Sequence, residues 1–126
     1  MKKYILLIIA SLAACVAMAA GNAEIRFDSV KFDLGTIKAS GGPVTATYNF
    51  TNVGTTPLVI VNVTNGGCGC TTPSYPKQPI APGKKGTVLI HFNPQGRRGE
   101  LNRNVRVKTN GKPSRTELYF TGVIVP

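Results

Sequence analysis

Residues 44–51 decide the fold class, and they read Val44-Thr45-Ala46-Thr47-Tyr48-Asn49-Phe50-Thr51. Apolar and polar side chains alternate through the whole stretch, so an extended chain would carry the apolar residues on one face and the polar residues on the other. This period of two predicts a strand with one buried face, as in an antiparallel sheet. Turn-forming residues flank the stretch, with Gly41-Gly42-Pro43 before it and Asn52-Val53-Gly54 after it.

Other stretches with the composition of strands lie on both sides of this one. They are residues 25–27, 30–34, 58–64, 87–92, 101–108 and 116–125. Residues 58–64 are almost continuously apolar and β-branched, which predicts a central strand covered on both faces. Asn110-Gly111 predicts a tight turn between the last two strands. Because no long helical periodicity occurs, about seven antiparallel strands predict an all-β, immunoglobulin-like sandwich of two sheets.

The composition fits one small domain. The chain has 126 residues, of which 42% are hydrophobic and 16% charged, with 14 Gly, 9 Pro and no Trp. These values argue against a disordered chain, a coiled coil or a collagen-like repeat. The length argues against a large catalytic architecture.

Residues 1–19 have the organisation of an export signal. Lys2 and Lys3 precede an apolar run, residues 5–16, which is too short to span a bilayer comfortably, and small residues follow up to Ala19. Cleavage near Ala19 would leave residues 20–126 as the sandwich domain. The alternative is lipidation of Cys15, because Leu12-Ala13-Ala14-Cys15 resembles a lipobox. We therefore expect a protein of the periplasm or the extracellular space, which is anchored to the envelope if Cys15 carries lipid.

Positive charge is concentrated in the second half of the chain. Residues 21–76 carry three basic and three acidic side chains, whereas residues 77–126 carry ten basic and two acidic ones, a net charge of +8. For an exported protein, this asymmetry favours contact with another envelope protein or with an anionic glycan or lipid surface. An ordinary solubilising charge is the alternative. The predicted contact residues are Arg97, Arg98, Arg103, Arg106 and Lys108. Few aromatic residues are present and they do not interleave with the basic ones, so nucleic acid is not an expected partner.

Cys68 and Cys70 are the only thiols of the domain itself, because Cys15 belongs to the signal. Two cysteines in an oxidising compartment predict a local disulfide, or a pair of thiols that stabilises the loop. Two alternatives remain. Thiol–disulfide exchange is one, although the pair lacks the helix N-terminus that lowers the thiol pKa in Cys-x-x-Cys enzymes. A copper or zinc site is the other, with His91, the only histidine, as a further ligand.

Catalytic motifs are missing from the sequence. No Gly-x-Ser-x-Gly, no His-Glu-x-x-His and no phosphate-binding glycine loop before a helix occurs, and the five carboxylates are dispersed. We expect neither enzymatic activity nor a cofactor, apart from the copper or zinc alternative.

Short phrases along the chain occur in an order that resembles one bacterial family. They are Phe32-Asp33-Leu34-Gly35-Thr36-Ile37, Tyr48-Asn49-Phe50-Thr51-Asn52-Val53-Gly54, Pro57-Leu58-Val59-Ile60, Cys68-Gly69-Cys70-Thr71-Thr72-Pro73, Ile80-Ala81-Pro82-Gly83 and Phe92-Asn93-Pro94. Together they resemble the domain-of-unknown-function family 1573, exported immunoglobulin-like proteins that are frequent in Bacteroidetes. They are also similar to Hydin-like and major-sperm-protein-like sandwiches, which serve mostly as scaffolding and interaction modules. The resemblance spans residues 27–125 and implies the sandwich fold, but it implies no activity.

Taken together, these observations predict an exported, non-catalytic binding and scaffolding module of the bacterial cell envelope. Its oligomeric state stays open. The alternative is a metal or thiol-redox accessory protein that uses Cys68 and Cys70.

Overall fold

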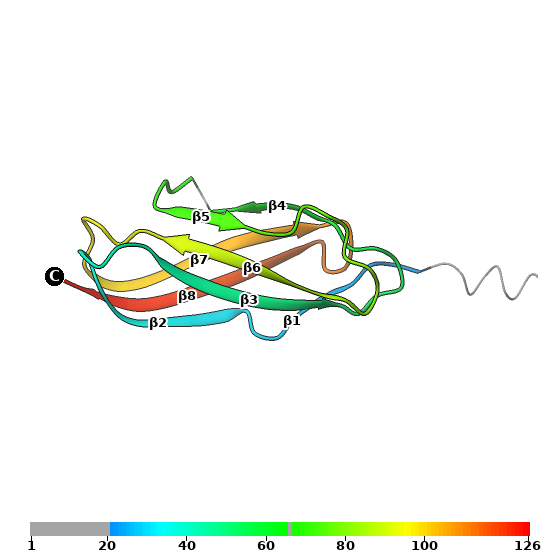
Figure 1. Cartoon of the computed structure of the whole chain (residues 1–126), viewed down its shortest axis with the longest axis horizontal. Helices are drawn as coiled ribbons and strands as arrows, with labels where there is room; N and C mark the ends of the chain where they lie inside the picture. The colour runs from blue at the N-terminus through cyan, green and yellow to red at the C-terminus, as the bar shows by residue number, and fades with distance from the viewer. Residues whose placement is uncertain (1–20, 66) are drawn as a thin grey trace, which may run out of the picture.

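The computed structural model describes residues 21–65 and 67–126, and all regular elements in this part are strands. They are β1 (Ile25–Phe27), β2 (Lys31–Lys38), β3 (Val44–Asn52), β4 (Ile60–Thr64), β5 (Thr71–Ser74), β6 (Lys85–Phe92), β7 (Gly99–Thr109) and β8 (Arg115–Val125). One sheet has the order β1-β3-β6-β5 and the other the order β2-β8-β7-β4, and together they form an elongated sandwich (Figure 1). The all-β, two-sheet fold predicted from the sequence is confirmed. The expected export signal, with Cys15 and the cleavage position at Ala19, lies outside the described residues. Within the described residues, no helix is long and apolar enough to cross a membrane.

The core lies between the two sheets and is formed by the apolar faces of alternating strands. On β3, Ala46, Tyr48 and Phe50 are buried, as the alternation of residues 44–51 predicts. Phe92 of β6 and Phe120 of β8 join the two sheets, with ring centroids 5.7 Å apart. The hydroxyl of Tyr48 donates a hydrogen bond of 2.7 Å to the carbonyl oxygen of Tyr119, and burial raises the pKa of this hydroxyl.

β2 differs from the antiparallel strand that the sequence predicts. It pairs with β8 in parallel, and it runs beyond Leu34 to Lys38. The register shifts between Asp33 and Thr36, where Gly35 adopts a positive φ of 69° and donates its N–H to the Asp33 carboxylate at 2.8 Å. Glycine tolerates this backbone conformation, so the strand continues through a bulge at the point where the sequence pattern breaks off.

β4 is an edge strand, so the prediction that residues 58–64 form a central strand is wrong. The side chain of Val61 is 53% exposed, whereas Ile60 and Val63 are buried. A register shift between Ile60 and Asn62 explains this pattern, because the extra residue lets Ile60 and Val63 both face the core. The apolar run therefore reflects a bulge and not burial on two faces.

β5 is an additional strand that the sequence did not predict. It pairs with β6 through residues 71–74. Because β5 is the edge of its sheet, Pro73 is tolerated there without loss of a ladder hydrogen bond.

Candidate functional site

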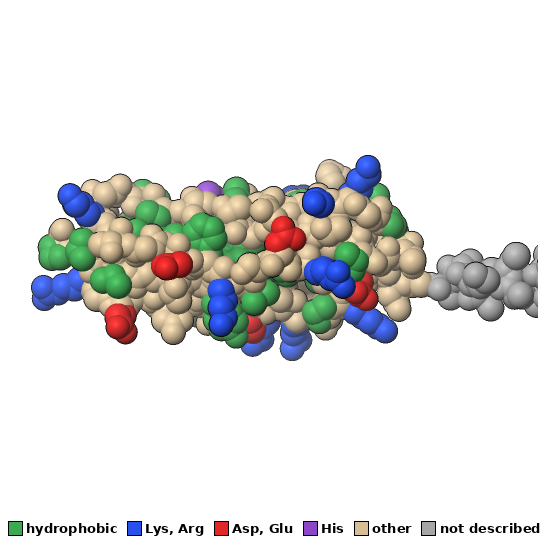
Figure 2. Space-filling model, turned by 90° about the horizontal axis from the view of Figure 1, so that it is seen from below, with side chains coloured by type: hydrophobic (Ala, Val, Ile, Leu, Met, Phe, Trp, Pro, Cys, Tyr) green, Lys and Arg blue, Asp and Glu red, His purple; other side chains and the backbone are tan. Residues whose placement is uncertain are grey.

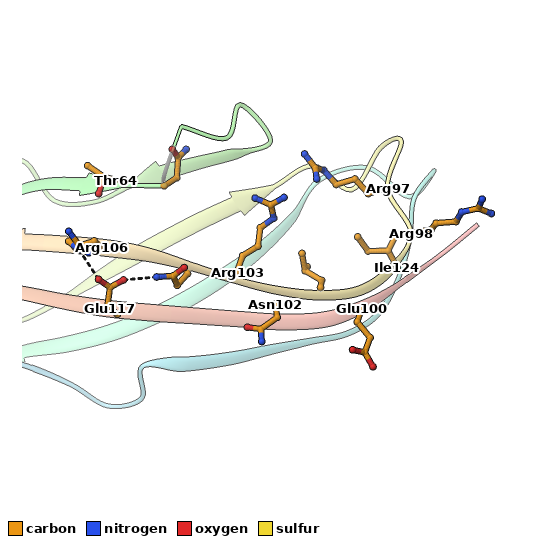
Figure 3. A pocket seen from close by; sticks show the side chains of 12 residues that line it. Thr64, Arg97, Arg98, Glu100, Asn102, Arg103, Arg106, Glu117 and Ile124 are labelled. Carbon is orange, nitrogen blue, oxygen red and sulfur yellow. Dashed lines mark hydrogen bonds and ion pairs between the residues drawn. The ribbon is translucent and has the colours of Figure 1, made fainter.

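A recess of about 640 Å³ opens along β7, next to the end of β4. Most of its lining is polar, and four of its residues are arginines. The lining residues are Thr64, Asn65, Arg97, Arg98, Glu100, Leu101, Asn102, Arg103, Asn104, Arg106, Glu117 and Ile124. They come from β4, from the loops that follow β4 and β6, and from β7 and β8 (Figure 3). The recess thus brings together four of the five basic residues predicted as contacts.

Arg103 occupies an unusual position in the sandwich. Along β7 it lies on the same face as the buried Leu101 and Val105, and it is itself partly buried. Figure 3 shows its side chain rising from β7 toward the part of the recess where Arg97 lies. Arg97 places Nη2 3.6 Å from Sγ of Cys68. Arg98, by contrast, points away from both toward the end of the sandwich (Figure 3). Arg97 and Arg103 are therefore the pair best placed to bind one anionic group.

Arg106 has a carboxylate partner inside the recess. Its Nε donates to Glu117 Oε1 at 2.7 Å, and Asn104 Nδ2 donates to Oε2 of the same carboxylate at 2.7 Å. The hydrogen bond from Arg106 holds the pKa of Glu117 below its usual value. Among the described residues this is the one ion pair, so Arg97, Arg98 and Arg103 are not paired with a carboxylate there. Lys108 lies further along β7 and does not line the recess.

The loop between β4 and β5 contributes Asn65 to the lining of the recess and contains the two cysteines. A disulfide joins Cys68 and Cys70, with a Cα–Cα distance of 5.3 Å. Asn65 organises this loop, because its Nδ2 donates to the carbonyl oxygens of Cys68 at 2.9 Å and Thr71 at 2.6 Å. Its Oδ1 accepts a hydrogen bond from the N–H of Gly67 at 3.0 Å. Asn65 thereby fixes the position of the sulfur that Arg97 approaches.

His91 lies on β6 with its ring outside the core. Its Nδ1 is 3.0 Å from Oγ1 of Thr45 on the neighbouring strand. Within residues 21–65 and 67–126, no group of three His, Cys, Asp or Glu side chains comes together as a metal site would require. In this structure both sulfurs are committed to the disulfide, so the geometry does not assemble the Cys68, Cys70 and His91 set proposed for copper or zinc.

Sequence reasoning missed the polar residues that shape the recess. Asn65 precedes two glycines, and an asparagine before glycine is a signal for an Asx turn that could have identified it. Asn104 carried no such signal, because its partner Glu117 becomes its neighbour only through the pairing of β7 with β8.

The remaining charged surface does not form a second dense patch on the face that Figure 2 shows. Lysine and arginine side chains are spread along the length of the domain there, with aspartate and glutamate side chains between them (Figure 2). On this face, positive charge is thus not gathered in one place, whereas four arginines line the recess.

Comparisons with known proteins agree with the fold. The family model described as "Protein of unknown function (DUF1573)" matches residues 25–124. A search of curated proteins found no match. A crystal structure of a protein of unknown function from Porphyromonas gingivalis W83 is similar, with a TM-score of 0.70 and 21% identity over 83% of this chain. This chain spans about half of that protein's length, 48%.

Two further solved structures extend the likeness to PapD-like folds. The ASH/PapD-like domain 7 of human CEP192 has a TM-score of 0.60 and 13% identity, covering 82% of this chain and 87% of that one. The YadV chaperone has a TM-score of 0.59 and 14% identity, covering 82% of this chain and 53% of that one. At these identities the likeness concerns the fold alone.

Proposed function

Because this chain belongs to the DUF1573 family, for which no function is established, we propose a function from its own surface: a non-catalytic binding module of the bacterial cell envelope. Its partner is negatively charged and binds at the arginine recess beside β7. The observation that carries this proposal is that Arg97, Arg98 and Arg103 line one recess without a carboxylate partner among the described residues. Guanidinium groups bind carboxylate and phosphate through paired hydrogen bonds, and such sites favour an anionic ligand.

The charges of the recess support this reading over a general solubilising role. Solubilising charge works wherever it is placed, and both signs are usually interspersed on a surface. Here Arg97 and Arg103 lie in the same part of one recess, so their charges repel each other unless an anion lies between them. Two acidic side chains, Glu100 and Glu117, also line the recess, and the second of them is already paired with Arg106.

Retention on two defined anionic probes, poly-glutamate and phosphatidylglycerol vesicles, tests the proposal as the salt concentration rises. The recess variant replaces Arg97, Arg98 and Arg103 by Gln. The matched control replaces Lys84, Lys85 and Arg115 by Gln, which removes the same charge from exposed positions at the other end of the strands. We expect the recess variant to lose retention and the control to keep most of it. Equal losses in both variants would mean that only net charge matters, and the proposal would fail.

The envelope location rests on residues 1–19, and the mass of the mature protein tests it. Cleavage after Ala19 gives a chain that begins at Ala20, whereas lipidation gives a chain that begins at a modified Cys15. A mature protein that retains Met1 to Ala19 without modification would refute export by either route.

A second candidate function, thiol–disulfide exchange, is favoured by one contact. Arg97 Nη2 lies 3.6 Å from Cys68 Sγ, and a neighbouring guanidinium stabilises a thiolate, the form that reacts or leaves. A thiol count on the isolated protein with increasing mild reductant tests this candidate. If Cys68 and Cys70 stay fully oxidised in reductant that opens labile disulfides, this function is excluded. The same samples, reduced and incubated with copper or zinc, test the metal alternative by mass.

A further inference from the structure

Within residues 21–65 and 67–126, part of β7 has no strand beside it on one of its two sides. β4 pairs with β7 only from Thr109 to Arg106, opposite Thr64. After Thr64 the chain leaves this sheet through the loop with the disulfide and joins the other sheet as β5. Among the described residues, nothing pairs with the β4 side of residues 99–105, and this free edge of β7 borders the arginine recess (Figure 3).

The hydrogen bonds at the far end of β7 show which backbone groups point to the free edge. Thr109 donates its N–H to Ser114, toward β8, and Asn110 donates its N–H to Val59, toward β4. β7 pairs with β8 without a register shift, so the direction alternates regularly along the strand. The N–H and C=O groups of Asn102 and Asn104 therefore face the free edge, where a further strand would bond to them.

Edges of this kind invite pairing, and proteins usually protect them with bulges, prolines or charge. The edge strands β2 and β5 have such protection in the bulge at Gly35 and in Pro73. The free edge of β7 has arginines instead, with Arg103 on the strand and Arg97 in the loop before it. Two copies of this edge would bring the same positive charges together, so self-pairing is opposed, whereas an acidic strand is attracted.

We propose that an extended, acidic segment of another protein adds as a strand to the free edge of β7, with carboxylates at Arg103 and Arg97. This inference rests on the proposed function and names its partner class. If the added strand runs antiparallel to β7, as β4 does, the residue opposite Arg103 lies on the same face as Arg103. A glutamate there meets the guanidinium, and the next residue on that face lies over Leu101. The preferred segment therefore alternates, with acidic or apolar side chains on one face and small polar ones on the other.

A labelled, end-blocked peptide, Thr-Glu-Thr-Val-Thr-Glu-Thr, serves as the probe for the wild-type chain. With glutamates facing Arg103, the threonine nitrogens point toward β7 and the glutamate and valine nitrogens point away. We expect N-methylation of the two central threonines to weaken binding roughly tenfold or more, because each lost hydrogen bond costs about 1 kcal/mol. N-methylation of the valine and one glutamate keeps the charge and should leave binding close to that of the parent peptide. Equal binding of the two methylated peptides would overturn strand addition.

Proline substitution tests the same edge from the protein side. Asn102→Pro removes an N–H that points to the free edge and is not part of the β8 ladder, so we expect it to abolish peptide binding while the sandwich still folds. Thr47→Pro is the matched control. On β3, Asn52 donates its N–H toward β6, whereas Asn49 accepts a hydrogen bond from Asp28 on the opposite side. Because these directions alternate along a strand, the N–H of Thr47 points to the same side as Asn49, which is an edge away from the arginines. Equal loss of peptide binding in both proline variants would refute the assignment to β7.

The outcomes separate this inference from the proposed function. If the wild-type chain binds phosphatidylglycerol vesicles or poly-glutamate through the recess but treats both methylated peptides alike, the inference fails and the proposed function stands. If it binds no anionic probe at all, both fail. If sedimentation shows a dimer of the wild-type chain that Asn102→Pro abolishes, self-pairing replaces the acidic partner and the inference is overturned.

Discussion

Replacing Asn52 by Ala should destabilise the domain more than any other single polar-to-alanine change in the described core. Asn52 is fully buried, with 0% exposure. Its Nδ2 donates to the carbonyl oxygens of Thr56 and Ile80, both at 2.9 Å. Its Oδ1 accepts from the N–H of Gly54 at 3.0 Å and of Glu24 at 3.3 Å. One side chain thus ties the end of β3 to three other segments of backbone.

The magnitude follows from these contacts. Three of the four bonds are 3.0 Å or shorter, and a typical hydrogen bond contributes about 1 kcal/mol to stability. Asn52→Ala leaves the backbone partners without a bond, so the free energy of unfolding should fall by about 3 kcal/mol. Because 1 kcal/mol shifts the Tm of a domain this size by about 4–8 °C, the Tm should fall by about 12 °C or more. Asn52→Asp should cost at least as much, since the carboxylate cannot donate and would face two carbonyl oxygens.

Urea denaturation followed by circular dichroism measures this loss, with the slope m checked for equality between variants. Asn62→Ala is the matched control, because Asn62 is exposed on β4 and should change stability by no more than about 0.5 kcal/mol. A loss of less than about 1 kcal/mol in Asn52→Ala at unchanged m would refute the reasoning, because it would show that the bonds make little net contribution.

Three further predictions concern other parts of the molecule. Gly111→Ala should lower the free energy of unfolding by about 1–3 kcal/mol, because a Cβ would lie 2.5 Å from the carbonyl oxygen of Ala23, whereas Gly69→Ala meets nothing within 4 Å and should cost less in the same denaturation assay. Glu117→Gln should flatten the pH dependence of stability in acid. The pKa of Glu117 is lowered in the folded state, so its pairing with Arg106 stabilises the domain above the unfolded pKa of about 4.3 and is lost as the pH falls through the folded value. Because this pair is largely exposed, the difference from the wild type should stay under about 1 kcal/mol, and a difference that grows as the pH falls would contradict the assignment. Replacing Cys68 and Cys70 together by Ser should cost at most about 1.6 kcal/mol, the chain entropy of so small a ring, and a much larger loss would show that the loop is held mainly by the disulfide and not by Asn65.

The sequence was sufficient to predict the strands whose alternation is regular. β3 and β7 follow the pattern closely, because each has one face on the core and one in solvent. β5 was missed because Thr71-Thr72-Pro73-Ser74 has neither apolar alternation nor strong strand formers, and its pairing with β6 depends on tertiary context. The bulge in β4 likewise hides inside an apolar run, since the sequence does not reveal which of Val61 and Asn62 is the extra residue.

The candidate site was predictable as a set of residues but not as an arrangement. The excess of arginine between residues 97 and 106 is visible in the composition, and four of the five named residues line the recess. Whether they share a recess depends on where β4 ends and on the register of β7 against β8, which follow from three-dimensional packing. The partial burial of Arg103, on the same face of β7 as the buried Leu101, is likewise visible only in the folded structure.

The place of β8 in its sheet has a consequence for the order of events during synthesis. β8 lies between β2 and β7. β2 therefore cannot pair until β8 has been synthesised, because Lys31 pairs with Tyr119. The sheet β1-β3-β6-β5, by contrast, has all its strands once β6 has been synthesised. Its apolar face stays uncovered until β7 and β8 follow. Contacts between such distant parts of a chain slow folding to the millisecond-to-second range. A chain synthesised only as far as β6 therefore exposes the apolar face of one sheet, and at this stage a chaperone would protect it most from aggregation.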